Sequence, residues 1–145
     1  MKTVLVLNKI DRLIVDKQME ASEIYIHLTQ IIENANSWIA ELIMSELFQR
    51  EQIVKQRRAR ANSNSSNGST DADAKWTEQD KIRFEKLREE ALEKAEKEIF
   101  YSPEKGNVVF ASAIDNWSFT IKSFAPKIAK PFNMNPAVLE KFLWG

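Results

Sequence analysis

The chain opens with a short apolar run that stops abruptly in polar residues. Residues 4–7 read Val-Leu-Val-Leu and are followed by Asn8, Lys9 and Asp11. A continuous apolar run of this kind is typical of a strand that is buried on both faces, as strands of parallel sheets are. Because open α/β sheets bind ligands at the carboxyl ends of their strands, the polar residues that follow the run are candidates for a binding site.

The same pattern returns near the end of the chain. Residues 108–111 form a second apolar run, which follows the turn-forming residues 102–106 and leads into Ser112 and Ala113. Two such strands with a helix between them are expected to pair in parallel, which brings their carboxyl ends to one edge of the sheet. Ser112 and Ala113 are therefore expected to lie beside residues 8–11.

Helical periodicity fills the space between the two apolar runs. Beyond a polar connection over residues 12–20, apolar residues recur every three or four positions as far as residue 48. This spacing predicts a long amphipathic helix on the sheet, with a length that allows a bend near residues 34–37. A second helix is predicted from Thr77 to about residue 100, opened by a capping arrangement between Thr77 and Asp80.

These patterns predict an α/β fold in three segments. Residues 1–48 and 101–145 supply two parallel strands with packed helices, the second segment ending in C-terminal helices. Residues 49–100 are expected to form an inserted, charged helical hairpin. Its loop, at about residues 61–74, contains no apolar side chain larger than Ala and is predicted to be disordered, because it can bury nothing that offsets its ordering entropy.

Composition and charge narrow the function classes without naming a partner. The 145 residues suit one modest domain, and 21 basic residues balance 21 acidic ones. The absence of Cys and the single His exclude a disulfide framework, a thiolate metal site and a multi-histidine site. No apolar stretch approaches the roughly 18 to 20 residues of a membrane span, and no secretory signal is present, so we expect a soluble, cytoplasmic protein with no membrane partner.

Asn8, Lys9 and Asp11 spell Asn-Lys-x-Asp, which resembles the guanine-reading motif of GTP-binding proteins. The Asp11 carboxylate can accept hydrogen bonds from N1 and N2 of guanine, a pairing that adenine cannot supply. Asn8 would brace the loop and face O6 and N7 of the base, while the aliphatic stem of Lys9 would lie over the ring. Ser112 and Ala113 resemble the fifth GTPase motif, whose backbone N–H groups and small side chain close on O6. These five residues are the predicted GTP/GDP contacts, and a solvated strand end is the alternative.

The phosphate-binding half of such a site is missing from this sequence. The three glycines lie far apart, so neither Gly-x-x-x-x-Gly-Lys-Ser/Thr nor Asp-x-x-Gly occurs. Phosphoryl transfer depends on groups that position and neutralise the phosphates, so no catalytic and no metal-binding residue is predicted here. We expect GTPase activity from the full-length protein, Mg²⁺ binding only together with the missing N-terminal half, and no activity from these 145 residues alone.

A basic cluster near the end of the first predicted helix offers a second candidate contact. It consists of Lys55, Arg57, Arg58 and Arg60. Such a cluster can lie against the phosphates of ribosomal RNA. The alternative is a solvated helix end, whose cations interact favourably with the helix dipole.

Four stretches taken in order resemble the second half of the GTPase domain of the elongation factor 2-like translational GTPase family. They are residues 8–12 (NKIDR), 32–36 (IENAN), 109–120 (VFASAIDNWSFT) and 143–145 (LWG). The resemblance covers about residues 3–48 and 99–145 and implies part of a P-loop GTPase domain.

The segment between these two ranges and the wording of residues 111–116 look closer to the ribosome-biogenesis branch of this family. That resemblance implies an action on the ribosome in maturation of the large (60S) subunit, through release of initiation factor 6 and together with the Shwachman-Bodian-Diamond syndrome protein. Two alternatives stay open. One is a fragment of elongation factor 2, which acts in ribosomal translocation, and the other is a non-catalytic helical-hairpin interaction module.

Overall fold

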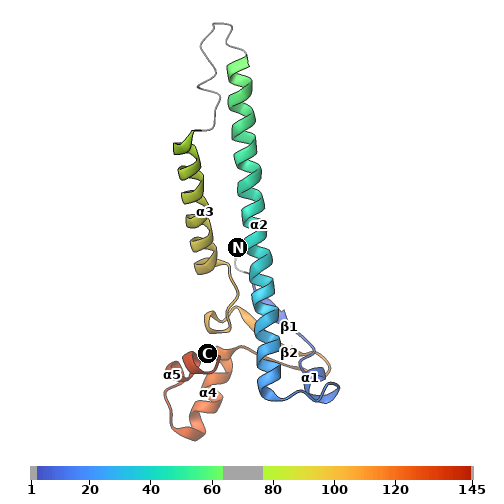
Figure 1. Cartoon of the computed structure of the whole chain (residues 1–145). Coiled ribbons are helices and arrows are strands. Elements are labelled where there is room, and N and C mark those ends of the chain that lie inside the picture. The colour runs from blue at the N-terminus through green and yellow to red at the C-terminus, as the bar shows by residue number, and fades with distance from the viewer. Residues whose placement is uncertain (1–2, 64–76, 145) are drawn as a thin grey trace. The chain divides into compact units, whose positions relative to one another are not determined.

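A computed structural model describes residues 3–63 and 77–144. The chain divides into two compact units. The sheet unit comprises Met1–Asn36 and Ile99–Gly145, and the hairpin unit comprises Ser37–Glu98. In chain order the elements are β1 (Leu5–Leu7), α1 (Asp11–Val15), α2 (Ala21–Ser63), α3 (Glu78–Glu98), the short 3-10 helix η1 (Pro103–Lys105), β2 (Val108–Ser112), β3 (Trp117–Phe119), α4 (Ile121–Phe132) and α5 (Pro136–Phe142) (Figure 1).

The sheet has the strand order β1-β2-β3. Strands β1 and β2 pair in parallel with Leu7 opposite Phe110, which confirms the predicted pairing of the two apolar runs. Strand β3 pairs with β2 in the antiparallel direction, with Ser112 opposite Trp117. The sequence had predicted two strands, so β3 corrects that expectation. As a consequence, residues 113–116 form the loop of a β-hairpin.

The core of the sheet unit lies between the strands and the helices that flank them. Its buried side chains are Leu7, Ile10, Leu13, Leu28, Ile32, Val108, Phe110 and Ile121. Burying an aliphatic or aromatic side chain of this size contributes roughly 1.5–3 kcal/mol, so this cluster is the main source of stability for the unit. Leu13 belongs to α1, which occupies part of the stretch that had been predicted to be a polar connection. Leu13 packs into the core from this short helix.

Two asparagines hold the stretch of chain that leads into β2. Asn36 donates from Nδ2 to the Tyr101 carbonyl at 2.9 Å and accepts from the Tyr101 N–H at 2.7 Å. Asn107 accepts from the Ser102 N–H at 2.9 Å and donates to the Phe100 carbonyl at 3.0 Å. Both side chains therefore satisfy backbone groups that belong to no helix or strand ladder.

The hairpin unit consists of part of α2 and of α3, which lie side by side in it (Figure 1). The predicted cap of α3 is confirmed, because the Thr77 N–H donates to Asp80 Oδ2 and the Asp80 N–H donates to Thr77 Oγ1, each at 3.3 Å. Helix α2 continues without interruption through residues 34–37 and through the predicted segment boundary after residue 48. Of the predicted loop at residues 61–74, the first three belong to α2 and the others lie outside the described residues. Among the described residues, no helix has the length and apolar character of a membrane span.

Candidate functional site

Asn8 joins the carboxyl ends of β1 and β2. Its side-chain Oδ1 accepts hydrogen bonds from the Lys9 N–H at 2.8 Å and from the Ala113 N–H at 3.1 Å. Just beyond it, the Ile10 N–H donates to the Ala111 carbonyl at 3.3 Å. The structure therefore brings the two predicted motifs together at one edge of the sheet.

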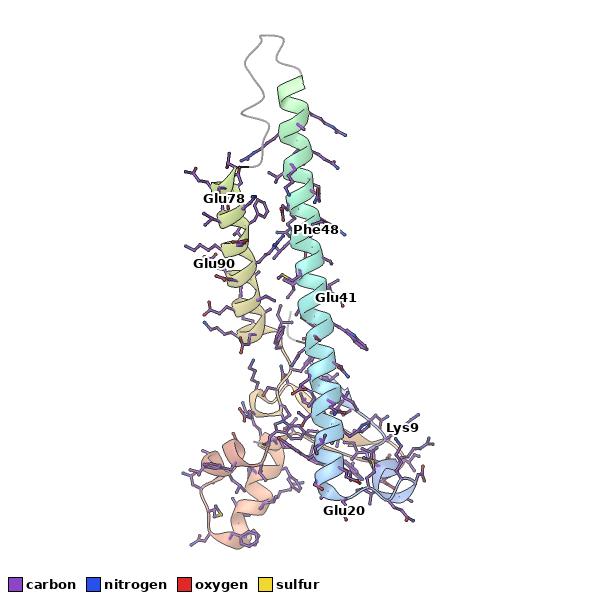
Figure 2. All side chains as sticks on the ribbon, in the orientation of Figure 1. Lys9, Glu20, Glu41, Phe48, Glu78 and Glu90 are labelled. Atoms are coloured by element: carbon purple, nitrogen blue, oxygen red, sulfur yellow. The ribbon has the colours of Figure 1, made fainter. Side chains whose placement is uncertain are left out.

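Lys9 occupies a backbone conformation that favours glycine. Its φ angle is 66°, in the left-handed region, which costs an ordinary residue roughly 1–2 kcal/mol. The hydrogen bond from the Lys9 N–H to Asn8 Oδ1 helps to hold this conformation. The side chain of Lys9 is exposed, at the end of β1 (Figure 2). Its aliphatic stem is therefore accessible to a ligand at this edge.

Asp11 carries a polar atom without a partner. The residue begins α1 and is half-buried. Its Oδ1 is buried and accepts no hydrogen bond from any described residue. A buried carboxylate oxygen in this state carries a desolvation cost that a ligand with N–H donors can offset, once the carboxylate turns toward it. Guanine has two such donors on the edge that Asp11 was predicted to read.

Ser112 and Ala113 lie differently at the end of β2. Ser112 has no exposed surface, and its Oγ both donates to Asp115 Oδ2 at 3.0 Å and accepts from the Asp115 N–H at 3.3 Å. Ala113 is exposed beside Asn8. The Ser112 hydroxyl thus supports the loop, while Ala113 borders the space that a ligand would take. Sequence reasoning had not singled out Asp115, although it stands within the stretch that carried the family resemblance.

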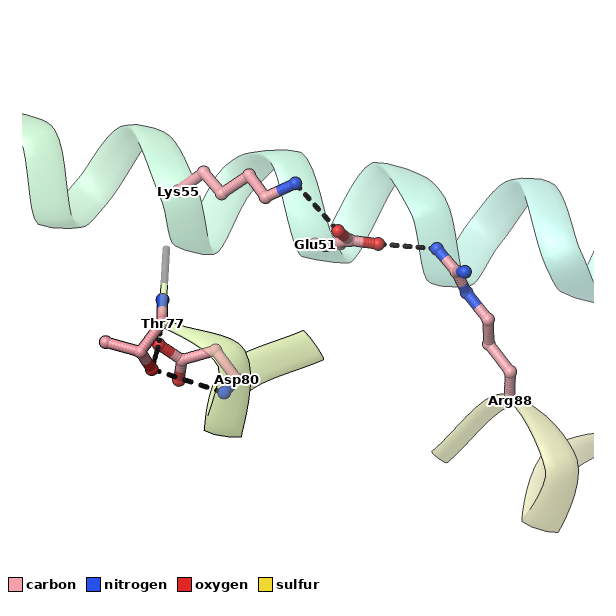
Figure 3. Close-up of polar contacts among 5 residues, drawn as sticks. All are labelled: Glu51, Lys55, Thr77, Asp80 and Arg88. Carbon is pink, nitrogen blue, oxygen red and sulfur yellow. Dashed lines mark hydrogen bonds and ion pairs between the residues drawn. The ribbon is translucent and has the colours of Figure 1, made fainter. Parts of the chain in front are cut away.

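Two cations of the basic cluster near the end of α2 bond acidic side chains of the hairpin unit. Lys55 bonds Glu51 at 2.8 Å, and Arg58 bonds Asp80 at 2.7 Å, so both hold acidic groups of the hairpin unit. Glu51 also accepts from Arg88 of α3 at 2.6 Å (Figure 3). Arg57 and Arg60 are exposed, as is Arg58. Because Arg57 and Arg60 are three positions apart on a helix, they lie on the same face.

These contacts lower the pKa values of two carboxyl groups. The pKa of Glu51 is lowered, mainly by the hydrogen bond from Lys55 and also by the charge of Arg88, while burial opposes the shift. The Arg58 hydrogen bond, followed by the one from Thr77, lowers the pKa of Asp80 to about 2. Both carboxylates therefore stay charged at neutral pH and link α2 to α3 within the hairpin unit.

In the described part of the chain, no group of three or more His, Asp or Glu side chains is placed to bind a metal ion. The edge formed by residues 8–11 and 113 carries groups that can hydrogen-bond a ligand. It carries the Asp11 carboxylate, whose Oδ1 is buried and unpaired among the described residues, and a small exposed alanine. The Asn8 Oδ1 is already engaged, which leaves its Nδ2 as a donor.

Comparison with known proteins agrees with the motifs. The chain is 36% identical over 145 residues to the human protein named elongation factor-like GTPase 1, a match that covers 99% of this chain. The chain is similar to a segment of elongation factor-like GTPase 1. This finding confirms the resemblance inferred from the sequence. No protein-family model matches the chain.

The yeast relative points the same way. Ribosome assembly protein 1 of Saccharomyces cerevisiae is 35% identical over 150 residues, which cover all of this chain. The chain spans 12% of the length of the human elongation factor-like GTPase 1 and 11% of the length of the yeast protein. Because the human match covers 99% of the chain, elongation factor-like GTPase 1 has a counterpart of the hairpin unit as well as of the sheet unit.

Proposed function

We propose that this chain supplies guanine recognition to a GTPase that acts on the ribosome. The observation that carries the proposal is the contact between Asn8 Oδ1 and the Ala113 N–H, which joins the two predicted motifs at the ends of neighbouring parallel strands. The names of the similar proteins, elongation factor-like GTPase 1 and ribosome assembly protein 1, support the reaction class and the setting.

Each residue at the site has a distinct part in this proposal. Asp11 accepts from N1 and N2 of guanine, so it sets the identity of the base. Asn8 donates from Nδ2 to the O6 and N7 side, since its Oδ1 is held by Lys9 and Ala113. The stem of Lys9 covers the ring, and the small side chain of Ala113 leaves room for it.

This segment contributes recognition of the base and no catalytic residue. The sequence has no Gly-x-x-x-x-Gly-Lys-Ser/Thr motif, which cradles phosphates in P-loop GTPases. GTP hydrolysis with Mg²⁺ would therefore need residues from the larger polypeptide, in which this segment corresponds to the second half of a P-loop GTPase domain. Residues of the hairpin unit then form an insertion within that domain.

We further propose that the complete protein acts in cytoplasmic maturation of the large ribosomal subunit. The name of the yeast relative supports assembly of the ribosome as the process. In this proposal the protein releases initiation factor 6 together with the Shwachman-Bodian-Diamond syndrome protein. Arg57, which is exposed on α2, is the cation of the basic cluster that we propose meets ribosomal RNA.

A second candidate function is a protein or RNA interaction module centred on the hairpin unit. It is favoured by one observation, namely that Ser37–Glu98 forms a compact unit whose two helices are linked by the ion pair of Glu51 with Arg88. Under this alternative, the end of β1 binds no nucleotide.

Replacing Asp11 by Asn in the complete polypeptide distinguishes guanine recognition from the interaction-module function. The new amide turns one acceptor into a donor facing N1–H and N2–H, so preference for GDP over ADP should fall by about 10²-fold or more. Asp16→Asn, an exposed carboxylate at the end of the same short helix, is the matched control and should keep the preference. Unchanged guanine preference in Asp11→Asn would refute the proposal.

A further inference from the structure

A ring of two hydrogen bonds closes the loop between β2 and β3. The Ser112 hydroxyl donates to Asp115 Oδ2 at 3.0 Å, and the Asp115 N–H returns a hydrogen bond to Ser112 Oγ at 3.3 Å. Ser112 has no exposed surface, so water does not reach this side chain. A buried hydroxyl without a partner is costly, and the exposed Asp115 supplies that partner from its own loop.

Both ends of this loop are anchored by the sheet. Phe110 pairs with Phe119 and Ser112 pairs with Trp117 across the β2–β3 ladder. The turn back into β3 passes through Asn116 at φ 56°, a conformation that Asn tolerates better than most residues. The β2–β3 ladder and the Asp115 contact therefore both help to fix the position of the loop.

The loop delivers one specific group to the candidate base site. The Ala113 N–H, which directly follows Ser112, donates to Asn8 Oδ1 at 3.1 Å. With Oδ1 held by this N–H and by that of Lys9, the side-chain amide of Asn8 has one orientation, and Nδ2 is its remaining donor. A line of contacts thus leads from Asp115 through Ser112 and Ala113 to Asn8.

We propose that Asp115 is a positioning residue for guanine recognition. It fixes Ser112, which sets the place of the Ala113 N–H, and this N–H orients the Asn8 amide toward the O6 and N7 edge of the base. Asp115 itself does not contact the nucleotide. The inference rests on the proposed function, because it assumes that the edge of residues 8–11 and 113 binds guanine.

Loss of the Asp115 side chain should weaken the contacts to the O6 and N7 edge of the base. Asp115→Ala removes the acceptor of the Ser112 hydroxyl, so the Asn8 amide loses its fixed orientation and GDP affinity should fall about threefold to tenfold. Asp115→Asn keeps an acceptor oxygen at the same place and should remain within about twofold of the unmodified protein. Asp16→Asn serves again as the surface control.

Base analogues test the route through Asn8 in the complete polypeptide. The 7-deaza form of GDP lacks N7 and so lacks part of the contact to Asn8, whereas inosine diphosphate lacks only the N2 group that Asp11 reads. Asp115→Ala should lower the affinity for inosine diphosphate by the same factor as for GDP, and should lower the affinity for 7-deaza-GDP by a smaller factor. A general loss of folding would lower all three equally.

Three outcomes can be told apart. The inference is supported if Asp115→Ala loses affinity for GDP and inosine diphosphate but less for 7-deaza-GDP, and if Asp115→Asn keeps the GDP affinity of the unmodified protein. Unchanged GDP affinity in Asp115→Ala, equal loss for all three nucleotides, or an Asp115→Asn variant as weak as Asp115→Ala overturns it while the guanine site stands. If the unmodified protein shows no preference for GDP over ADP, the proposed function itself is wrong.

Discussion

The side chain of Asn36 helps to fix the chain path into β2. Its amide makes two hydrogen bonds to the backbone of Tyr101, at 2.7 and 2.9 Å. Asn36→Ala leaves a partly buried N–H and carbonyl without these partners and should destabilise the sheet unit by about 1–3 kcal/mol. Urea unfolding of the chain measures this, and Asn34→Ala, an exposed asparagine on the same helix, is the control. Equal stability of the two variants would contradict the role given to Asn36.

Glu51 makes the hairpin unit sensitive to acid. Its side chain is largely buried between Lys55 of its own helix and Arg88 of α3, and these partners lower its pKa below the ordinary value of 4.5. A carboxyl whose pKa is lower in the folded state stabilises above its unfolded pKa, and that contribution is lost as pH falls through the folded pKa.

Circular dichroism at decreasing pH should therefore show a loss of helix in the unmodified chain that begins below about pH 4.5. Glu51→Gln removes the charge and should already be destabilised at neutral pH, because Arg88 loses its charged partner. Glu46→Gln, which breaks the exposed pair with Arg50, is the control and should behave like the unmodified chain. Identical acid profiles for Glu51→Gln and the unmodified chain would contradict this account.

The helices and strands that could be predicted from the sequence are those whose pattern extends over several residues. The apolar runs of β1 and β2 and their parallel pairing were predictable, and so was the Thr77–Asp80 cap of α3. Strand β3 was missed because its alternation spans only Trp117, Ser118 and Phe119, too few positions to separate a strand from the approach to a helix.

The candidate site shows the same limit. The motif residues were readable as a pattern, and their adjacency followed from parallel pairing. The proposed role of Asp115 could not be predicted from the sequence, because it depends on the hairpin that β3 makes and on the complete burial of Ser112. Likewise, four neighbouring cations could not be sorted by sequence, since only the fold shows that Lys55 and Arg58 bond acids of the hairpin unit.

The exposed Arg57 of α2 is predicted to contact a phosphate of ribosomal RNA. Arg57→Gln should weaken binding of the complete protein to ribosomal RNA and reduce the slope of log affinity against log salt by about one, the value for one phosphate contact. Lys86→Gln, an exposed lysine of α3, is the control. Filter binding at several salt concentrations measures both slopes. If the slope of Arg57→Gln equals that of Lys86→Gln, the α2 surface is an ordinary solvated helix.

The sheet that carries the proposed base-reading edge leaves apolar side chains exposed at β1. Strand β1 is at one edge of the described sheet; Val6 within it is 58% exposed, and Val4 just before it is 55% exposed. Apolar strand residues this exposed are usually covered by further structure. This supports the proposal that the segment works as part of a larger polypeptide.

The 145 residues alone should consequently neither hydrolyse GTP nor hold it tightly. They lack the motifs that position and neutralise the phosphates, and base contacts alone supply only part of the affinity for a nucleotide. Phosphate release from GTP with Mg²⁺ by the purified chain measures the first point, with buffer lacking protein as the control. Sustained turnover would show that the chain contains a phosphate site that its motifs do not reveal.

The most direct test of guanine recognition is hydrogen–deuterium exchange of the complete polypeptide with GDP, with ADP and without nucleotide. The account predicts that GDP slows exchange in peptides covering residues 8–13 and 112–116, that ADP does not, and that peptides from the hairpin unit are unchanged. Protection of the hairpin unit alone, or equal protection by ADP, would contradict the assignment of the guanine site to the ends of β1 and β2.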